Sequence, residues 1–454
     1  MNAVRRIGLA VAAALTLAGS AAATETPSVE ELAVLKARLA AQQALLETQM
    51  QQLREQQAKL DEFERRLNAS GATAAAAAPP SAPKVSSRYD DVGVIVGGSL
   101  RTTLTTTGAR MLPDATPFVV LPSVPGVREG TSKIDARLST LLVAIRGREF
   151  AGFQLGGVIQ AQLFDGDLLS GQYGVYPGVA YVEAVNDRWR VAAGLQPDVF
   201  SPRMPRMVDS MSAMAGSGNP GNSMKPQLRV ERTVAVEGGT LLLQGALADA
   251  EPSNIQPPAL DSTENTGKPN LEARIAWTQG AVDRTTSWAP YPDWEVGLSG
   301  ASGSFRTFSL ANAFAAYDTR LSGVSLEGAV RLSPRLALQG EWYRGRAFAA
   351  YLGGIFQTVT SDRAPVHSEG GWGELAWWWR PDAHSHIGYG RDRTWSTSSA
   401  QPAVRANETA FANIYWEPSP MTTLGLEATW RRTEYIGNVD NDGFALMLSS
   451  ELRF

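Results

Sequence analysis

Apolar residues occupy every second position at the end of the chain and through much of the sequence before it. In the last stretch, one face carries Phe444, Leu446, Leu448, Leu452 and Phe454, and the other carries Ala445, Met447, Ser449, Glu451 and Arg453. This period of two predicts a β-strand with one face suited to lipid and the other to water. A strand of this kind that ends on an aromatic residue favours the closing strand of an outer-membrane barrel, because an open edge would leave unpaired backbone groups in hydrocarbon. A soluble β-sandwich could also end in this way.

The same alternation continues from residue 88 to residue 454, and the connections within it alternate between short and long. The first strand alternates Val94, Val96, Leu100 and Leu104 with Ser99, Arg101, Thr103 and Thr105. Short turns are expected near 147–148 and at 186–187, 237–239, 333–335, 381–382 and 417–420, with one longer connection at 280–292. Long loops are expected at 108–131, 165–176, 198–225, 250–268, 301–317, 349–369, 396–404 and 436–442. We count about sixteen strands, an even number that places both barrel ends and the short turns on the periplasmic side.

Tryptophans fall near the ends of the expected strands. They are Trp189, Trp277, Trp294, Trp342, Trp416 and Trp430, with a run of three, Trp377 to Trp379, just before a short turn. Indole rings favour the membrane–water interface, so this placement predicts an aromatic belt. The alternative is that these rings fill the core of an ordinary β-sandwich.

The first 23 residues have the features of a secretory signal. Arg5 and Arg6 precede an apolar run at 7–18, and small residues at 21–23 form a cleavage site. An uncleaved anchor is the alternative. No later apolar run approaches the length that a membrane helix needs. The chain contains no cysteine, which excludes disulfides and thiol-ligated metals.

Residues 24–71 are expected to form a periplasmic coiled coil, with a helix over 29–67. Leucines recur every seven residues at Leu32, Leu39, Leu46, Leu53, Leu60 and Leu67. The glutamines Gln42, Gln49 and Gln56 occupy the companion seam position in the middle, which is compatible with a trimer. The alternative is a single solvated helix. An Ala/Pro/Ser-rich linker follows over 72–87, and the barrel over 88–454.

Charge and composition exclude one class of function. The chain has 41 basic and 45 acidic residues, for a net charge of −4, which argues against a nucleic-acid binder. The hydrophobic content of 44% is ordinary for a barrel, because inward polar residues dilute the outward apolar ones.

Several short motifs in the barrel segment give the chain a family resemblance. They are Gly152-Phe153-Gln154-Leu155-Gly156 followed by Phe164-Asp165-Gly166, Ala180-Tyr181-Val182-Glu183, Gly194-Leu195-Gln196-Pro197, Pro226-Gln227-Leu228-Arg229 and Leu338-Gln339-Gly340-Glu341-Trp342-Tyr343. With the order of signal, coiled coil, linker and barrel, the whole mature chain resembles the DcaP-like trimeric porins of Gram-negative outer membranes. The resemblance implies a homotrimer that admits small, often anionic solutes. The chain departs from the family pattern at Gly178-Val179, where basic residues are expected, and in its first strand, which lacks the usual aromatics.

Strand phase and loop position give the candidate pore-lining residues. The inward arginines of the wall are Arg101, Arg137, Arg190, Arg229, Arg274, Arg331 and Arg431, and the inward acids are Glu231, Glu272, Glu327, Glu341, Glu374 and Glu427. The loop 198–225 is the candidate to fold inward and carries Arg203, Arg206, Asp209 and Lys225. Opposed charges across a narrow section would select solutes by a transverse field. The alternatives are ion pairs that only stiffen the wall and a loop that only covers the mouth.

Enzymatic and metal sites find little support in the sequence. The three histidines are His367, His384 and His386; none has an evident catalytic partner, and the pair His384 and His386 lacks a third metal ligand. Residues 438–443 imitate the start of a calcium loop, but its twelfth position is Ser449 rather than glutamate. We therefore expect no catalytic residues, no metal and no cofactor.

The sequence as a whole predicts an all-β transmembrane antiparallel barrel of about sixteen strands with an N-terminal α-helical coiled coil. The expected function is an outer-membrane porin for passive diffusion of small hydrophilic solutes, with anions among them. Its expected partners are two further copies in a homotrimer, outer-membrane lipid and the solutes, with no nucleic acid. The alternative functions are a structural tether between outer membrane and periplasm, anchored by the barrel, and a barrel lipid hydrolase.

Overall fold

The computed structural model describes residues 92–164, 172–221, 223–249, 261–280, 289–309 and 315–454. The expected signal peptide, coiled coil and linker lie outside these residues. The strands of the main sheet are β1 (Gly93–Thr107), β4 (Thr131–Asp135), β5 (Thr140–Phe150), β6 (Phe153–Gln162), β7 (Tyr176–Val185), β8 (Trp189–Pro197), β9 (Met224–Val236), β10 (Gly239–Ala248), β11 (Asp261–Asn265), β12 (Asn270–Gln279), β13 (Trp294–Ser309), β14 (Ala315–Ser333), β15 (Leu336–Arg346), β16 (His367–Arg380), β17 (Ala383–Trp395), β18 (Val404–Ser419), β19 (Thr422–Tyr435) and β20 (Asn441–Arg453).

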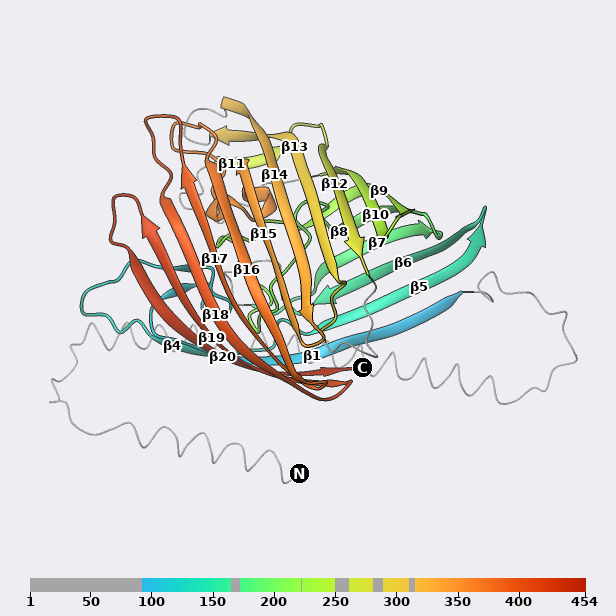
Figure 1. Ribbon diagram of the computed structural model, residues 1–454. Helices are drawn as coiled ribbons and strands as arrows, with labels where there is room; N and C mark the ends of the chain where they lie inside the picture. Colours follow the sequence, from blue (N-terminus) through green and yellow to red (C-terminus); the bar gives the residue numbers. More distant parts are fainter. Residues whose placement is uncertain (1–91, 165–171, 222, 250–260, 281–288, 310–314) are drawn as a thin grey trace, which may run out of the picture. The chain divides into compact units, whose positions relative to one another are not determined.

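These elements form one closed antiparallel barrel, in which each strand lies beside its neighbours in sequence (Figure 1). Two strand positions are each shared by two short elements: β4 and β5 both pair with β1, and β11 and β12 both pair with β13. Eighteen elements in the described part of the chain therefore make a barrel of sixteen strands. The expected strand number and antiparallel architecture are confirmed.

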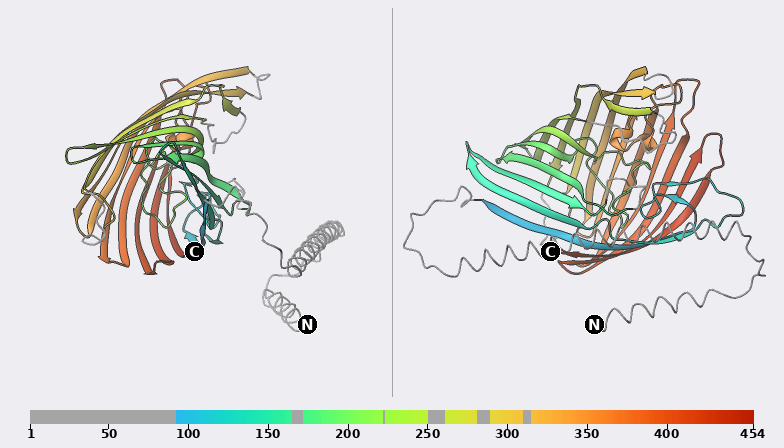
Figure 2. Two further views of the ribbon diagram at one scale, coloured as in Figure 1. Left: turned by 90° about the vertical axis from the view of Figure 1, so that its right-hand side faces the viewer. Right: turned by 180° about the vertical axis from the view of Figure 1, so that it is seen from behind.

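The last strand closes the barrel against the first. β20 pairs with β1 from Ser99 opposite Arg453 to Thr107 opposite Ala445. Beyond this ladder, Gly98 and Phe454 exchange two backbone hydrogen bonds, each 3.1 Å long. In Figure 2 the end of the chain lies beside β1, so the terminal aromatic residue extends the pairing of β20 with β1.

The outer face is apolar because the alternation of the sequence is kept along the strands. In β20 the side chains of Phe444, Leu446 and Leu448 are more than half exposed, whereas Ala445 and Met447 are buried. Five exposed tryptophans lie at the strand ends that carry short turns: Trp189, Trp277, Trp377, Trp379 and Trp416. Trp342 is exposed as well, but it lies in the middle of β15 and not near a strand end as expected. The run of three does not act as one unit, because alternation turns Trp378 inward, where it packs on Ala337 and Ala376.

Short turns connect the strands at one barrel end, as expected, with one correction. The turn between β5 and β6 lies at Ala151–Gly152 and not near 147–148. A β-bulge between Arg146 and Glu149 absorbs the irregularity and lets both strands continue for several residues. Both turn residues have positive φ (52° and 79°), a backbone conformation that glycine adopts without strain.

Long connections leave the opposite barrel end, and some of them enter the barrel. The long loop expected at 301–317 is wrong in its bounds, because β13 continues to Ser309 and β14 begins at Ala315. The connection between β1 and β4 carries the short strands β2 (Met111–Leu112) and β3 (Val119–Val120), and the one between β15 and β16 carries the 3₁₀ turns η1 (Ala349–Tyr351) and η2 (Gly354–Phe356). Inside the barrel, Phe200, Tyr343 and Phe348 are fully buried in one aromatic cluster. The Phe200 and Phe348 ring centroids lie 4.8 Å apart. No helix in the described part of the chain is long and apolar enough to cross a bilayer.

Candidate functional site

The connection between β8 and β9, residues 198–223, runs inside the barrel; we call it the inner loop. Val199, Phe200, Val208 and Met214 on this loop are fully buried, although they belong to a connection and not to a strand. Its contacts lie on the inner faces of β12–β20 and of β1. We call the inner face of β15–β20 the covered wall.

Four wall glutamates accept backbone N–H groups of the inner loop. The N···O distances are 2.7 Å from Val199 to Glu272, 2.7 Å from Arg203 to Glu341, 2.6 Å from Arg206 to Glu374, and 2.7 and 3.2 Å from Val208 and Asp209 to Glu427. All four carboxylates are buried. The loop is therefore fixed to the wall through its backbone, at four separate strands.

Glycines allow the loop backbone to approach the wall closely. Gly218 has φ +96°, and a Cβ placed there would lie 2.3 Å from the carbonyl oxygen of Gly371 on β16. A Cβ on Gly390 of β17 would lie equally close to the Ser217 carbonyl oxygen. Side chains at either position would push the loop away from the covered wall.

The charged side chains of the inner loop all meet partners of opposite charge. Arg203 lies 2.7 Å from Glu295 and 3.3 Å from Glu327, and Arg206 lies 2.9 Å from Glu417. The two loop arginines that were predicted to line the pore are thus paired with glutamates of the wall. Arg206 is the more exposed of the two, with 41% of its side chain accessible.

Asp209 forms an ion pair inside the protein rather than in the lumen. Its carboxylate lies 3.1 Å from Arg431 of β19, and both side chains are buried. Burial raises the pKa of the Asp209 carboxyl, and the Arg431 guanidinium and the Ser212 hydroxyl act against that shift. Arg431 also donates to Thr409 at 2.7 Å, which connects the loop to β18 as well.

The connection 347–366 holds the inner loop from its other side. The Gly221 N–H donates to the Tyr351 carbonyl at 2.7 Å, and the Tyr351 hydroxyl donates to Glu272 at 2.9 Å. Lys225, at the end of the loop, lies 2.9 Å from Asp198 at its start and 3.8 Å above the Tyr351 ring. The two ends of the inner loop are therefore joined to each other and to the second connection.

The predicted wall arginines are each paired with a carboxylate. Arg190 lies 2.6 Å from Glu183 and 3.0 Å from Glu231, and Arg229 lies 2.5 Å from Glu231. Arg274 bonds to Glu327 and lies 3.1 Å from Glu295. Together with Arg203 these residues form a mixed cluster on β7–β9 and β12–β14.

The other predicted arginines lie apart from this cluster. Arg101 of β1 donates to Ser210 of the inner loop at 2.9 Å, so it belongs to the loop attachment. Arg137 lies between β4 and β5, buried against Asp135 at 2.6 Å, and Arg331 bonds to Asp293 beside a short turn. With Arg431, which pairs with Asp209, the structure therefore separates the seven predicted wall arginines into a central cluster of three and four outlying residues.

The inner face of β5–β7, bordered by Arg190 of β8, is not covered by the inner loop; we call it the open wall. Its inward side chains are only half-buried: Leu142, Gln154, Gln160, Gln162, Tyr181 and Glu183. None of these six residues is among the predicted pore residues. Strand phase could have found them, because Leu155, Ile159 and Val182 beside them are plainly outward.

The two histidines of β17 lie buried in a hydrogen-bonded chain. His384 Nδ1 and His386 Nε2 are 2.9 Å apart, and His386 Nδ1 lies 2.7 Å from Glu374, the carboxylate that also accepts the Arg206 N–H. Among the described residues, no group of three or more histidines and carboxylates is arranged to hold a metal ion. The imidazoles therefore support the attachment of the loop.

Comparison with known proteins addresses the fold. No protein-family model and no curated protein sequence matches the chain. The chain is similar to the solved outer-membrane channel DcaP of Acinetobacter baumannii, with TM-score 0.62 and 15% identity over 80% of this chain and 98% of that chain. It is also similar to a loop L8 deletion mutant of OmpT, an outer membrane protein of Vibrio cholerae (0.51, 10%, 80% and 100%), and to an anion-selective porin from Comamonas acidovorans (0.50, 9%, 80% and 100%). The resemblance to the DcaP-like porins is confirmed for the fold.

Proposed function

We propose that the protein is a passive outer-membrane porin for small hydrophilic solutes. The observation that carries this proposal is the asymmetry inside the barrel: the inner loop lies against the inner faces of β12–β20 and β1 and leaves the open wall of β5–β7 uncovered. A water-filled path along the open wall would be narrowed by the loop without being closed. The solved structures with the same fold are described as outer-membrane channels and porins, which supports a non-enzymatic role.

The solute path runs between the inner loop and the open wall, where polar side chains meet it. Gln160, Gln162 and Tyr181 supply neutral hydrogen-bonding groups, and Arg190 with Glu183 supplies charge. Arg206 carries the most exposed guanidinium of the loop and enters the lumen from the side of β18, where it pairs with Glu417. Because most arginines here are paired, the preference for anionic solutes is modest and rests chiefly on Arg206, Arg190 and Arg229.

The assembly is a homotrimer, with the short turns and the N-terminal coiled coil in the periplasm. Support comes from the even number of barrel strands and the heptad leucines in the sequence. One OmpT structure with this fold is described as a trimer form, which is said of that protein.

Conductance in planar bilayers tests this function. A porin gives stable ohmic steps, and three pores per particle give steps in groups of three. Reversal potentials in a salt gradient then give the ion preference, which we expect to favour anions slightly. A tether with a plugged barrel would pass little current. Deleting residues 29–67 and measuring the oligomer mass tests the coiled coil separately, since an unchanged trimer would show that barrels assemble without it.

A further inference from the structure

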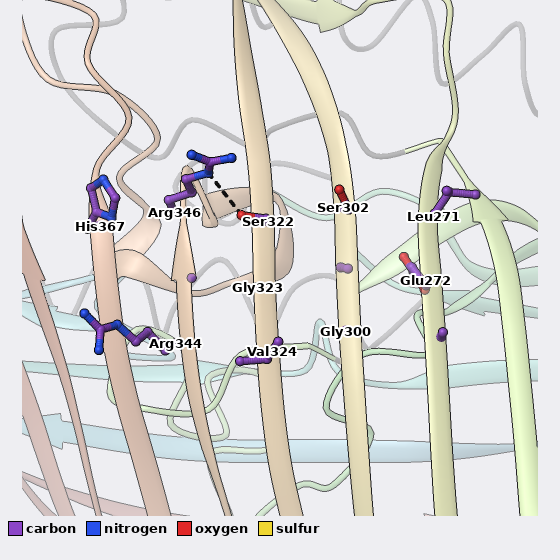
Figure 3. Close-up of a pocket in the computed structure, with 13 residues that line it drawn as sticks. Leu271, Glu272, Gly300, Ser302, Ser322, Gly323, Val324, Arg344, Arg346 and His367 are labelled. Carbon is purple, nitrogen blue, oxygen red and sulfur yellow. Dashed lines mark hydrogen bonds between the residues drawn. The ribbon is translucent and has the colours of Figure 1, made fainter.

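A hollow of about 640 Å³ lies on the outer face of the barrel, across β12–β16 near their long-loop ends (Figure 3). The outward residues at its centre are small: Gly300, Ser302 and Ser322. Figure 3 shows Arg344, Arg346 and His367 on one flank and Leu271 on the other. The hollow thus forms where small residues replace the large apolar side chains that cover the rest of the outer face of the barrel.

The outward direction of these residues follows from burial on alternate positions. Leu271 and Val324 are more than half exposed, whereas their neighbours Glu272 and Ser325 are buried inside the barrel. The hollow therefore faces the surroundings of the barrel and has no part in the lumen. No inner-loop residue lines it.

The basic side chains at the hollow lack acidic partners. Arg346 donates to the Ser322 hydroxyl at 3.0 Å, and Arg344 lies over the Trp395 ring at 5.3 Å; no ion pair with a carboxylate of the described residues is formed by either. Glu369 stands opposite Arg344 in the strand register, yet it does not pair with it. The His367 ring stacks on the same tryptophan, 6.0 Å between centroids.

Two other outward arginines at the same barrel end are paired, in contrast to Arg344 and Arg346. Arg391 of β17 lies 3.3 Å from Glu408, and Arg432 of β19 lies 3.8 Å from Glu434 and 3.6 Å from Asp440. Two guanidiniums that form no ion pair with a described carboxylate, beside a concave surface, offer bidentate sites that match a phosphate group.

Below the charged flank, the outer face of the barrel is apolar. In the strand register Leu271 lies level with Arg346 and Val324 lies level with Arg344. The next outward row towards the middle of the strands is apolar and exposed: Leu298, Leu326 and Trp342. A ligand that fits must therefore combine an anionic head near the arginines with an apolar chain along the barrel. This is the arrangement of a lipid held at a membrane surface.

We propose that the hollow binds a phosphorylated glycolipid of the outer leaflet, with a sugar phosphate on Arg344 and Arg346 and an acyl chain over the small residues. The site uses the orientation proposed above, in which the long loops face outward. It does not use the pore. The lipid occupies the hollow as a specific neighbour of the barrel and packs against the outer faces of β13 and β14.

Native mass spectrometry of the full chain in detergent tests the site, with purified lipid A carrying both phosphates as the probe. The double variant Arg344→Gln/Arg346→Gln should lower the affinity for this lipid at least tenfold. The matched control, Arg391→Gln/Arg432→Gln, removes two outward arginines that are already paired and should change it less than twofold. After enzymatic removal of the phosphates from lipid A, the native chain and the double variant should bind this lipid with the same affinity.

Ser302→Leu provides a second test, because it fills the hollow from outside and leaves both arginines in place. It should weaken binding of phosphorylated lipid A without affecting the fold, which circular dichroism checks. Equal losses in the two arginine variants, or equal binding of phosphatidylglycerol and lipid A, would overturn the proposal. So would a loss of trimer in the double variant with unchanged lipid binding, since the hollow would then be an interface between copies. Conductance of each variant is measured in parallel, so a failure of the porin proposal is seen independently.

Discussion

The covered wall and the open wall belong to one barrel and share one alternating pattern, but they have different surroundings. On the covered wall, inward polar residues such as Glu374, Asn407, Thr409 and Arg431 are buried and hydrogen-bonded to the inner loop or to one another. On the open wall, inward residues of β5–β7 remain half-exposed. The same strand geometry therefore serves as a docking surface on one side and as a pore lining on the other.

The difference shows that charge alone does not identify a pore residue in a barrel. Glu427 and Glu183 are both inward glutamates, yet the first accepts two loop N–H groups and the second pairs with Arg190 beside the lumen. A buried charge depends on its partners, whereas a half-exposed charge is compensated by water as well. The same type of substitution should therefore have different effects on stability and conductance on the two walls.

The largest contrast is expected in stability. Arg431→Ser leaves the Asp209 carboxylate buried without its partner and should lower the free energy of unfolding by about 3–5 kcal/mol. Arg190→Ser acts on a partly exposed pair and should lower it by about 1 kcal/mol or less. Urea unfolding in detergent micelles measures both. Equal effects would contradict the distinction between the walls.

A smaller effect, on conductance, should follow from releasing the loop. The triple variant Glu341→Gln, Glu374→Gln and Glu427→Gln replaces three carboxyl acceptors of loop N–H groups by amides, and each of these hydrogen bonds contributes about 1 kcal/mol. We expect larger and noisier single-channel currents, because the loop can then leave the wall. The control Glu183→Gln/Glu231→Gln changes two acids that bind no loop backbone, and its currents should stay quiet. A quiet triple variant would show that the loop is held by other contacts.

The smallest effect is expected in ion selectivity. Arg190→Ser removes a positive charge beside the path and should shift the reversal potential modestly towards cations. Arg431→Ser removes a charge that lies under the loop and should leave the reversal potential of the folded channel unchanged. A shift in the second variant alone would mean that ions pass on the covered side.

Most of the fold could be predicted from the sequence, because a membrane barrel imposes the alternation on every strand. The outward positions of β20 and the strand number are examples. The exceptions have local causes: the bulge after Arg146 moved one turn, and strict alternation turned Trp378 away from the belt.

The candidate site could be predicted only in part. Strand phase identifies an inward residue such as Glu341 but does not say whether it meets water or a loop. Its contacts with Ser201 and Arg203 join residues about 140 positions apart in sequence, which no local pattern encodes. The hollow beside Arg344 was missed for the same reason, since it depends on small residues from separate strands.

Thiol accessibility tests the central claim directly, and the absence of native cysteine makes it clean. Gln160→Cys places a thiol on the open wall. Thr409→Cys places one under the inner loop, where the Thr409 Oγ1 now lies 2.8 Å from the Ser217 Oγ. A small water-soluble thiol reagent should modify the first in folded protein and reduce its current in planar bilayers, while the second stays unmodified. Rapid modification of the second with block of the current, and no reaction of the first, would contradict the account.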